Sequence, residues 1–253
     1  MLVANPNDTA AEVSISFYTE QGPRNADPVT VPARSRLTMS ASDTIWARSA
    51  GISVGSDQPV YAERAMYWAD RSEGHTATLT SAPSRQWYLA EGCTDYGFET
   101  WITILNPGNA ASAVDMRFLC EDGAGQAGTV VVPEVSLYGP GRRSGTCSMG
   151  AAAHANKWYL AEGATHSGFD TWLLLYNPGD VDTTATVCAM TSGGEQEIDE
   201  VRVAARRRVT VKVDDYYDGS LSLRVAAAEP LCCERATYWS ARSGGTCSTG
   251  YAR

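Results

Sequence analysis

The stretch Trp87-Tyr88-Leu89-Ala90-Glu91-Gly92 occurs a second time, unchanged, as Trp158-Tyr159-Leu160-Ala161-Glu162-Gly163. Several shorter phrases also recur along the chain. Repetition of one unit is typical of scaffolds and binding arrays, because duplication multiplies surface rather than assembling one active site. The shorter phrases are Gly97-Phe98-Glu99-Thr100-Trp101 with Gly168-Phe169-Asp170-Thr171-Trp172, Asn5-Pro6 with Asn106-Pro107 and Asn177-Pro178, and Glu63-Arg64-Ala65-Met66-Tyr67-Trp68 with Glu234-Arg235-Ala236-Thr237-Tyr238-Trp239.

These phrases divide the chain into three copies of one unit. We expect a first repeat over residues 1–86, which lacks the Trp-Tyr-Leu-Ala-Glu-Gly strand and so indicates a fragment of a longer protein with other modules. A shortened middle repeat covers 87–156, and a complete repeat covers 157–253. In the opposite register, that strand closes the preceding unit and residues 1 to about 92 are the complete copy. In both registers the middle repeat is too short to close a sandwich without borrowing from a neighbour.

The last copy predicts the fold. Residues 221–225 alternate between apolar and polar side chains, as a half-buried strand does. Turn residues such as Asn177-Pro178-Gly179-Asp180 separate the predicted strands, and no window has a helical period with caps. Seven short strands in one unit predict an all-β chain of tandem immunoglobulin-like β-sandwich repeats. The predicted strands are 158–162, 171–176, 184–190, 197–203, 207–213, 221–225 and 231–238.

Composition excludes several classes of protein. With 253 residues and 43% hydrophobic residues, the chain is globular rather than disordered. Its net charge of -9 disfavours nucleic-acid binding, which needs a basic face. No apolar run approaches the roughly 20 residues of a membrane helix, so no membrane insertion is expected. The residues after Met1 have neither the basic region nor the apolar core of a signal peptide.

The chain contains seven cysteines. No pair has the short spacing of a zinc site, and the histidines are scattered, so we expect no metal. Disulfides in an exported protein are the better interpretation. Cys232 and Cys233 precede Cys247 by a distance that lets the chain fold back. Because adjacent strand residues face opposite sides, one of the two is predicted to form a disulfide with Cys247.

The repeated phrases resemble a repeat found in large secreted and surface proteins of high-GC Gram-positive bacteria. The matching positions include the two Trp-Tyr-Leu-Ala-Glu-Gly stretches, Asn106-Pro107-Gly108, Asn177-Pro178-Gly179 and Gly74-His75. The resemblance covers nearly the whole chain. The family has no established activity, and its repeats sit beside peptidoglycan amidase, cell-wall-binding or other extracellular modules. The resemblance therefore implies an accessory or structural role at the cell surface or outside the cell.

Aromatic residues allow two interpretations. Most tryptophans occupy equivalent positions in two copies, which favours packing between sheets, with Trp158, Trp172 and Trp239 mostly buried in the last copy. The alternative is a platform on which the apolar faces of sugar rings stack. Trp46, Tyr216 and Tyr217 lie outside the repeated phrases and are the better candidates for such a carbohydrate-binding surface.

Charged residues in the repeated phrases predict ion pairs. The last copy alone holds both Glu162 and Arg235, so we expect these two to pair, because a guanidinium binds a carboxylate through two parallel hydrogen bonds. The residues left over in the other copies, Glu91 and Arg64, are expected to pair with each other. The alternative is that both glutamates face solvent. Asp214, Asp215 and Asp218 are interpreted as a solvated turn rather than a calcium site.

No catalytic motif stands out, and no cofactor is expected. A carboxylate pair repeated in two copies, such as Glu91 with Glu99, would require two small active sites, one in a shortened unit. We therefore expect a non-enzymatic structural, spacer or adhesion-type repeat region of a secreted or cell-surface bacterial protein. The alternative function is a carbohydrate- or cell-wall-binding module that serves a wall-directed or polysaccharide-directed enzyme, with a cell-wall or other glycan as its partner.

Overall fold

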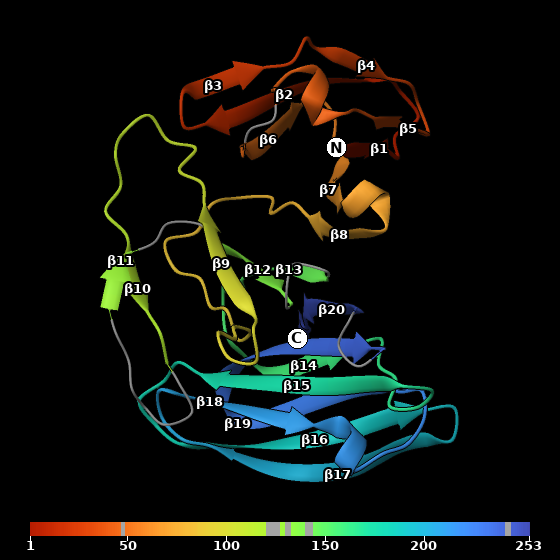
Figure 1. Cartoon of the computed structure of the whole chain (residues 1–253), viewed down its shortest axis with the longest axis vertical. Coiled ribbons are helices and arrows are strands. Elements are labelled where there is room, and N and C mark those ends of the chain that lie inside the picture. Colours follow the sequence, from red (N-terminus) through yellow and green to blue (C-terminus); the bar gives the residue numbers. More distant parts are fainter. Residues whose placement is uncertain (47–48, 120–126, 130–132, 140–143, 241–243) are drawn as a thin grey trace.

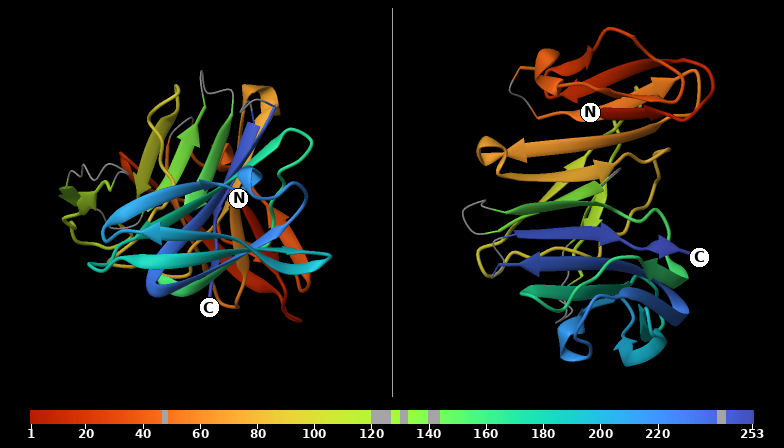
Figure 2. Two further views of the ribbon diagram at one scale, coloured as in Figure 1. Left: turned by 90° about the horizontal axis from the view of Figure 1, so that it is seen from below. Right: turned by 90° about the vertical axis from the view of Figure 1, so that its right-hand side faces the viewer.

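A computed structural model describes residues 1–46, 49–119, 127–129, 133–139, 144–240 and 244–253. This part of the chain is built from antiparallel strands with short 3-10 turns and contains no α-helix (Figure 1). The all-β class predicted from the sequence is therefore confirmed. The strands form several separate sheets that follow one another along the long axis of the molecule (Figure 2).

The first unit consists of two facing sheets. In β2 (Ala11–Thr19) the side chains of Val13, Ile15 and Phe17 are buried while their neighbours face outward, as the alternation in the sequence predicts. These residues pack with Val3 and Val31 into one core. One sheet has the order β5 (Ser35–Thr38), β1 (Leu2–Asn5), β7 (Tyr61–Trp68) and β8 (Glu73–Thr78); the other pairs β2 (Ala11–Thr19) with β3 (Gly22–Asn25), β4 (Val29–Val31) and β6 (Gly51–Ser56).

The middle unit contains one three-stranded sheet and one small hairpin. The sheet has the order β13 (Gly145–Met149), β12 (Pro133–Tyr138) and β9 (Glu99–Ile104). The hairpin pairs β10 (Asp115–Arg117) with β11 (Ala127–Thr129). Among the described residues, no buried cluster belongs to this unit alone. Ala90 and Ala151 of this unit pack into clusters of the last unit instead.

The last unit is organised around one long strand, β19 (Ser222–Trp239). The sixth and seventh predicted strands are therefore one strand, which corrects the sequence-based prediction. β19 passes from one sheet into the next at a bulge opposite β14 (Ala155–Leu160). At this point the Thr183 hydroxyl bonds the backbone N–H and carbonyl groups of Glu229. The other strands are β14 (Ala155–Leu160), β15 (Phe169–Asn177), β16 (Thr183–Thr191), β17 (Gly194–Val203), β18 (Arg207–Lys212), β20 (Gly244–Thr249) and β21 (Tyr251–Ala252).

The repeated phrases hold the backbone in place. The buried Asn177 amide donates to the Val181 and Val203 carbonyls and accepts from the Gly179 N–H group. Asn5 holds the equivalent turn of the first unit in the same manner. The Thr171 hydroxyl donates to the Ala164 carbonyl at 2.6 Å. Each of these side chains bonds backbone groups at a turn or strand end, a local structural role that accounts for the recurrence of the phrases.

A tyrosine faces a glycine across each of three equivalent hairpins. Tyr67 pairs with Gly74 in β7–β8, and Tyr238 pairs with Gly245 in β19–β20. Tyr138 and Gly145 form the third pair, in β12–β13. A Cβ added to any of these glycines would lie within 2.7 Å of the facing tyrosine ring. The glycines therefore let the rings lie flat across the neighbouring strand, which protects an otherwise weak strand position.

Candidate functional site

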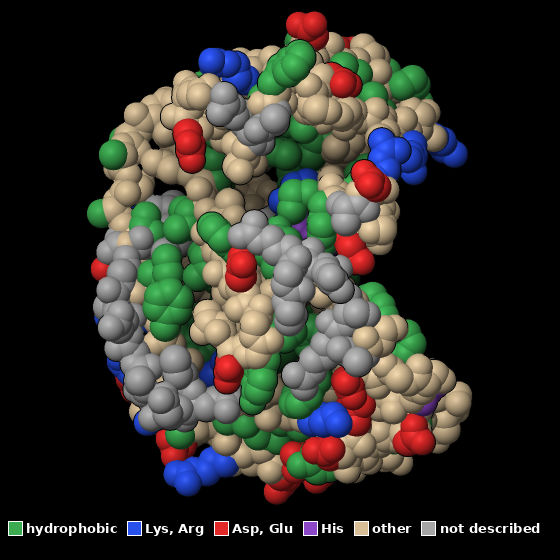
Figure 3. Space-filling model, in the orientation of Figure 1, with side chains coloured by type: hydrophobic (Ala, Val, Ile, Leu, Met, Phe, Trp, Pro, Cys, Tyr) green, Lys and Arg blue, Asp and Glu red, His purple; other side chains and the backbone are tan. Residues whose placement is uncertain are grey.

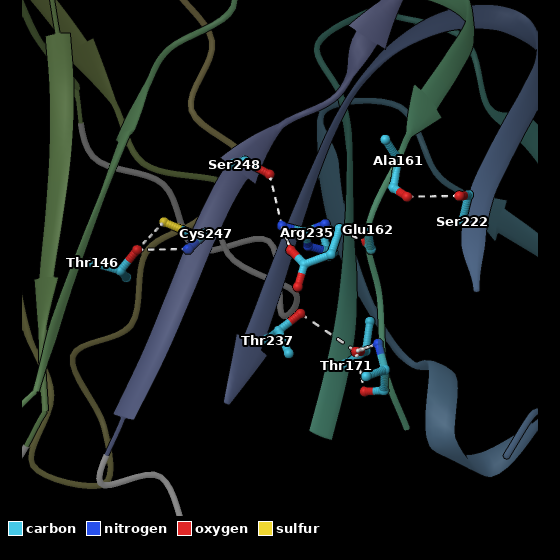
Figure 4. A network of polar contacts seen from close by, with 10 residues as sticks. Thr146, Ala161, Glu162, Thr171, Ser222, Arg235, Thr237, Cys247 and Ser248 are labelled. Carbon is cyan, nitrogen blue, oxygen red and sulfur yellow. Dashed lines mark hydrogen bonds and ion pairs between the residues drawn. The ribbon is translucent and has the colours of Figure 1, made fainter. Parts of the chain in front are cut away.

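A polar network lies where the middle and last units meet (Figure 4). The Arg235 side chain is buried, and its Nη2 atom lies 2.9 Å from Oε2 of Glu162 and 3.2 Å from the Ser248 hydroxyl. Its Nη1 atom donates to the Glu162 backbone carbonyl. The structure thus brings together the two residues of the predicted ion pair. The Glu162 side chain is 69% exposed, so the pair sits at the edge of the sandwich rather than in its core.

We predict a weak but measurable coupling between Glu162 and Arg235. Because Glu162 is exposed, a double-mutant cycle with Glu162→Gln and Arg235→Ala should give about 0.5–1 kcal/mol, measured by chemical denaturation. Arg235→Ala alone should cost more, since Arg235 also binds the Glu162 carbonyl and Ser248. The exposed Arg34–Asp8 pair is the control and should show no coupling. A Glu162–Arg235 coupling of zero would refute the pairing.

The predicted Glu91–Arg64 pair is wrong. Glu91 lies 3.9 Å from Arg208 of the last unit, and the Arg208 Nε atom donates to the Ala90 carbonyl at 2.6 Å. Arg64 donates to the Cys147 sulfur at 3.1 Å. The physical reason is the position of the Trp-Tyr-Leu-Ala-Glu-Gly stretch of the middle unit. It packs against the last unit and does not complete the first.

Glu234 is the centre of this junction and was not singled out by sequence reasoning. It is 1% exposed and accepts the Glu91 N–H group at 2.6 Å. The hydroxyls of Ser148 and Thr249 lie 3.2 and 3.1 Å from its other oxygen. Burial raises the pKa of the Glu234 carboxyl to about 7, and the nearby Glu91 carboxylate adds to this shift. Burial also raises the pKa of Glu91.

The β15 sheet is buried on both faces at this junction. Leu173 and Leu175 face the core of the last unit, whereas Leu174 and Trp172 face a second cluster. That cluster contains Ala90 of the middle unit together with Ala236 and Cys247. A strand covered on both faces has consecutive apolar residues instead of alternation. The run Trp172-Leu173-Leu174-Leu175 was therefore the signal in the sequence that could have revealed a neighbour on the outer face.

The repeated tryptophans differ in burial. Trp158 is 2% exposed, and its indole N–H group donates to the Leu231 carbonyl at 2.8 Å. Trp172 and Trp239 are partly buried and lie outside the core cluster that contains Trp158. Trp172 cannot share a face with its neighbour Leu173, because adjacent strand residues point to opposite sides. Trp239 lies at the end of β19, beyond the core cluster.

The proposed sugar platform is not assembled. Trp46, which is 86% exposed, follows a 3-10 turn of the first unit, Ala41–Asp43. Tyr216 and Tyr217 follow the equivalent turn of the last unit, Val213–Asp215, at the opposite end of the molecule (Figure 1). Tyr217 packs against the core, so it does not present a free face. The neighbouring Asp214 accepts the Thr171 N–H group, so this carboxylate supports the backbone.

The predicted disulfide does not form. Among the described residues, Cys232, Cys233 and Cys247 are all buried free thiols, and Cys120 lies outside the described part. Cys247 faces Ala236 across the β19–β20 pair. Cys233 precedes Ala236 by three residues in β19, so its side chain points to the opposite face of the strand. Cys232 is four residues away, about 13 Å along a strand, which is too far for a disulfide.

In the part of the chain that the structure describes, no three histidine, cysteine, aspartate or glutamate side chains gather in a way that could hold a metal ion. No helix of this part has the length and apolar character needed to cross a membrane.

Comparison with known proteins shows only partial likenesses. No protein-family model matches the chain, and no curated protein sequence matches it. The crystal structure of Thermotoga maritima 1070 is similar at 15% identity with a TM-score of 0.36, over 40% of this chain and 96% of that one. The Anabaena sensory rhodopsin transducer is similar at 18% identity with a TM-score of 0.30, over 34% of this chain and 85% of that one. Neither likeness bears on function.

Proposed function

We propose that this chain is a non-enzymatic structural region of a secreted or cell-surface bacterial protein. In this proposal, tandem immunoglobulin-like β-sandwich repeats act as a stiff spacer that presents other modules of a longer protein. The repeated residues support it, because Asn5, Asn177 and Thr171 bind backbone groups rather than facing a common site. Repeats that use their recurring residues for folding are expected of a scaffold.

The observation that carries the proposal is the shared burial between the middle and last units. The Glu91 N–H group of one unit binds the buried Glu234 carboxyl of the next, and Ala90 is 1% exposed within the cluster of the last unit. An independent hinge between domains needs an exposed linker with few contacts across it. Here an apolar cluster and a buried hydrogen bond join the two repeats, so they are expected to move as one body.

Support for the surface location comes from the resemblance of the repeated phrases. The cysteines add no support, because the described thiols form no disulfide. The location is tested in the organism that produces the protein. An epitope tag inserted beside the exposed Val181 should bind antibody on intact cells if the region lies outside the membrane. Labelling that requires permeabilised cells would contradict the location.

The spacer role is tested by small-angle X-ray scattering of the full chain. We expect the scattering curve to fit one rigid shape at both low and high salt, because buried apolar contacts are insensitive to ionic strength. Ala90→Arg places a charge inside the shared cluster and should broaden the distribution of interatomic distances. The control is Val181→Arg, at a position that is 61% exposed, which should leave the curve unchanged. A flexible ensemble for the unmodified chain would overturn the proposal.

A further inference from the structure

A cavity of about 420 Å³ lies where the three units meet. It is lined by β7, β8 and the turn between them in the first unit, by β13 in the middle unit, and by the β19–β20 hairpin in the last unit. These are the equivalent hairpins of the three copies, and β13 contacts both β8 and β20. In Figure 3 the right-hand outline of the molecule is indented between the first and last units. The cavity therefore exists only because the repeats are stacked.

Two aromatic rings line this cavity, one from each outer unit. Tyr67 is 63% exposed although it belongs to a strand, and Trp239 is partly buried. Gly74 faces Tyr67 and Gly244 faces Trp239, and a Cβ on either glycine would collide with the ring. Because the two glycines have no side chain, both rings can lie flat against the neighbouring strand. Flat, preorganised rings with an apolar face and a polar edge are suited to stacking against a ligand.

A buried histidine with unused hydrogen-bonding atoms also lines the cavity. His75 is 9% exposed, and neither of its ring nitrogens has a hydrogen-bond partner among the described residues. Burial and the nearby Arg64 guanidinium lower the pKa of His75 to about 4, so the ring is neutral at pH 7. A neutral imidazole offers one donor and one acceptor. Leaving both unsatisfied in a buried place is costly, and a turn of the ring toward the cavity would let a ligand hydroxyl satisfy one of them.

The remaining lining is polar and balanced in charge. Arg71 and Glu73 contribute one charge of each sign. Hydroxyl groups come from Ser72, Thr76 and Thr246. Such a lining favours a neutral ligand that is rich in hydroxyl groups. The cavity volume lies within the range of roughly 300–1,000 Å³ that is typical of small-molecule sites.

We propose that the cavity binds a neutral pyranose saccharide, with a sugar ring stacked on Tyr67 or Trp239 and a hydroxyl bonded to His75. The site is distinct from Trp46, Tyr216 and Tyr217, because it needs hairpins from all three units. It does not rest on the spacer role. A negative result in the binding experiment below would therefore leave the spacer role intact, and a negative result in the scattering experiment above would leave the saccharide site intact.

The test is a titration of the full chain at pH 7 with three neutral disaccharides, cellobiose, maltose and N,N′-diacetylchitobiose. Binding is measured by calorimetry and by quenching of tryptophan fluorescence. We expect saturable binding of at least one disaccharide, weakened at least tenfold by Trp239→Ala and by His75→Leu. Tyr67→Ala changes an exposed side chain, so it should weaken binding while the chain stays folded, as checked by circular dichroism.

Trp46→Ala and Trp101→Ala are the controls, since both rings are exposed and lie outside the cavity. Both variants should bind as the unmodified chain does. The proposal would be overturned if none of the three disaccharides binds at millimolar concentration. It would also be overturned if binding persists unchanged in Tyr67→Ala, Trp239→Ala and His75→Leu, or if it is lost in a control.

Discussion

Replacing Trp158 by alanine should cost about 3–5 kcal/mol of stability, the range for deleting a large buried aromatic side chain. Trp158 is 2% exposed in the core of the last unit, and its indole donates to the Leu231 carbonyl. The substitution removes that hydrogen bond and opens a cavity between β14 and β19. The free energy of unfolding, measured with urea, reports the loss.

Two other tryptophans serve as controls for this prediction, one at the equivalent position of the middle unit and one that is exposed. Trp87 occupies the same place in the repeated phrase and donates to the Ser84 carbonyl, but it is only partly buried, so its loss should cost less. Trp46 is 86% exposed and its replacement should change stability by less than about 0.5 kcal/mol. Equal effects at Trp158 and Trp46 would mean that Trp158 is not a core residue.

Glu234→Gln should remove one contribution to the pH dependence of stability, the Glu234 contribution between about pH 4.5 and 7, which is read from the difference in stability between the variant and the unmodified chain. The pKa of Glu234 is about 7 in the folded protein, against an ordinary value of 4.5. Between these values the Glu234 carboxyl binds more protons in the folded state than in the unfolded state, so its contribution to stability falls as the pH rises. The loss should be about 3 kcal/mol and complete just above pH 7. Below pH 4.5 the group is protonated in both states and the loss disappears.

Glutamine is a suitable replacement because it resembles the protonated carboxyl. Its oxygen can still accept the Glu91 N–H group, and its amide can donate to the Ser148 and Thr249 hydroxyls. The variant should therefore be more stable than the unmodified chain at pH 8. Glu63→Gln is the matched control, because Glu63 is the equivalent residue of the first unit and is exposed. A pH dependence of stability that is the same in Glu234→Gln and in the unmodified chain would show that Glu234 does not titrate in this range.

Local sequence determined the strands and the turns. The alternation of Val13, Ile15 and Phe17 places one face of β2 in a core whatever surrounds it, because the side-chain period of a strand is two. Asn177 carries its own hydrogen-bonding partners within the same turn, so the Asn-Pro phrase specifies that turn locally. These features depend on neighbours in the sequence, and they could be predicted.

The sequence also predicted an ion pair between two residues of the same repeat. Glu162 and Arg235 both belong to the last copy, and the presence of both phrases in that copy alone predicted their contact. The continuity of β19 was harder to predict, because Ala228-Glu229-Pro230 in its middle has the composition of a turn. The strand continues through it since Thr183 of a neighbouring strand supplies the hydrogen bonds that Glu229 needs. A local pattern carries no information about such a partner.

Only the tertiary structure decided what the repeats do to one another. Glu91 and Glu162 lie in identical phrases, yet Glu162 is exposed beside Arg235 whereas Glu91 is buried beside Glu234. The difference arises because the shortened middle unit packs its Trp-Tyr-Leu-Ala-Glu-Gly stretch against the next unit. Glu63 and Glu234 also occupy equivalent positions in two copies, yet Glu63 is exposed and Glu234 is buried. Even the local structure differs, since Trp158 to Leu160 belong to β14 whereas Tyr88 makes only an isolated bridge to Ala151. Strand pairing, burial and pKa therefore depend on the neighbouring unit, which no repeated phrase encodes.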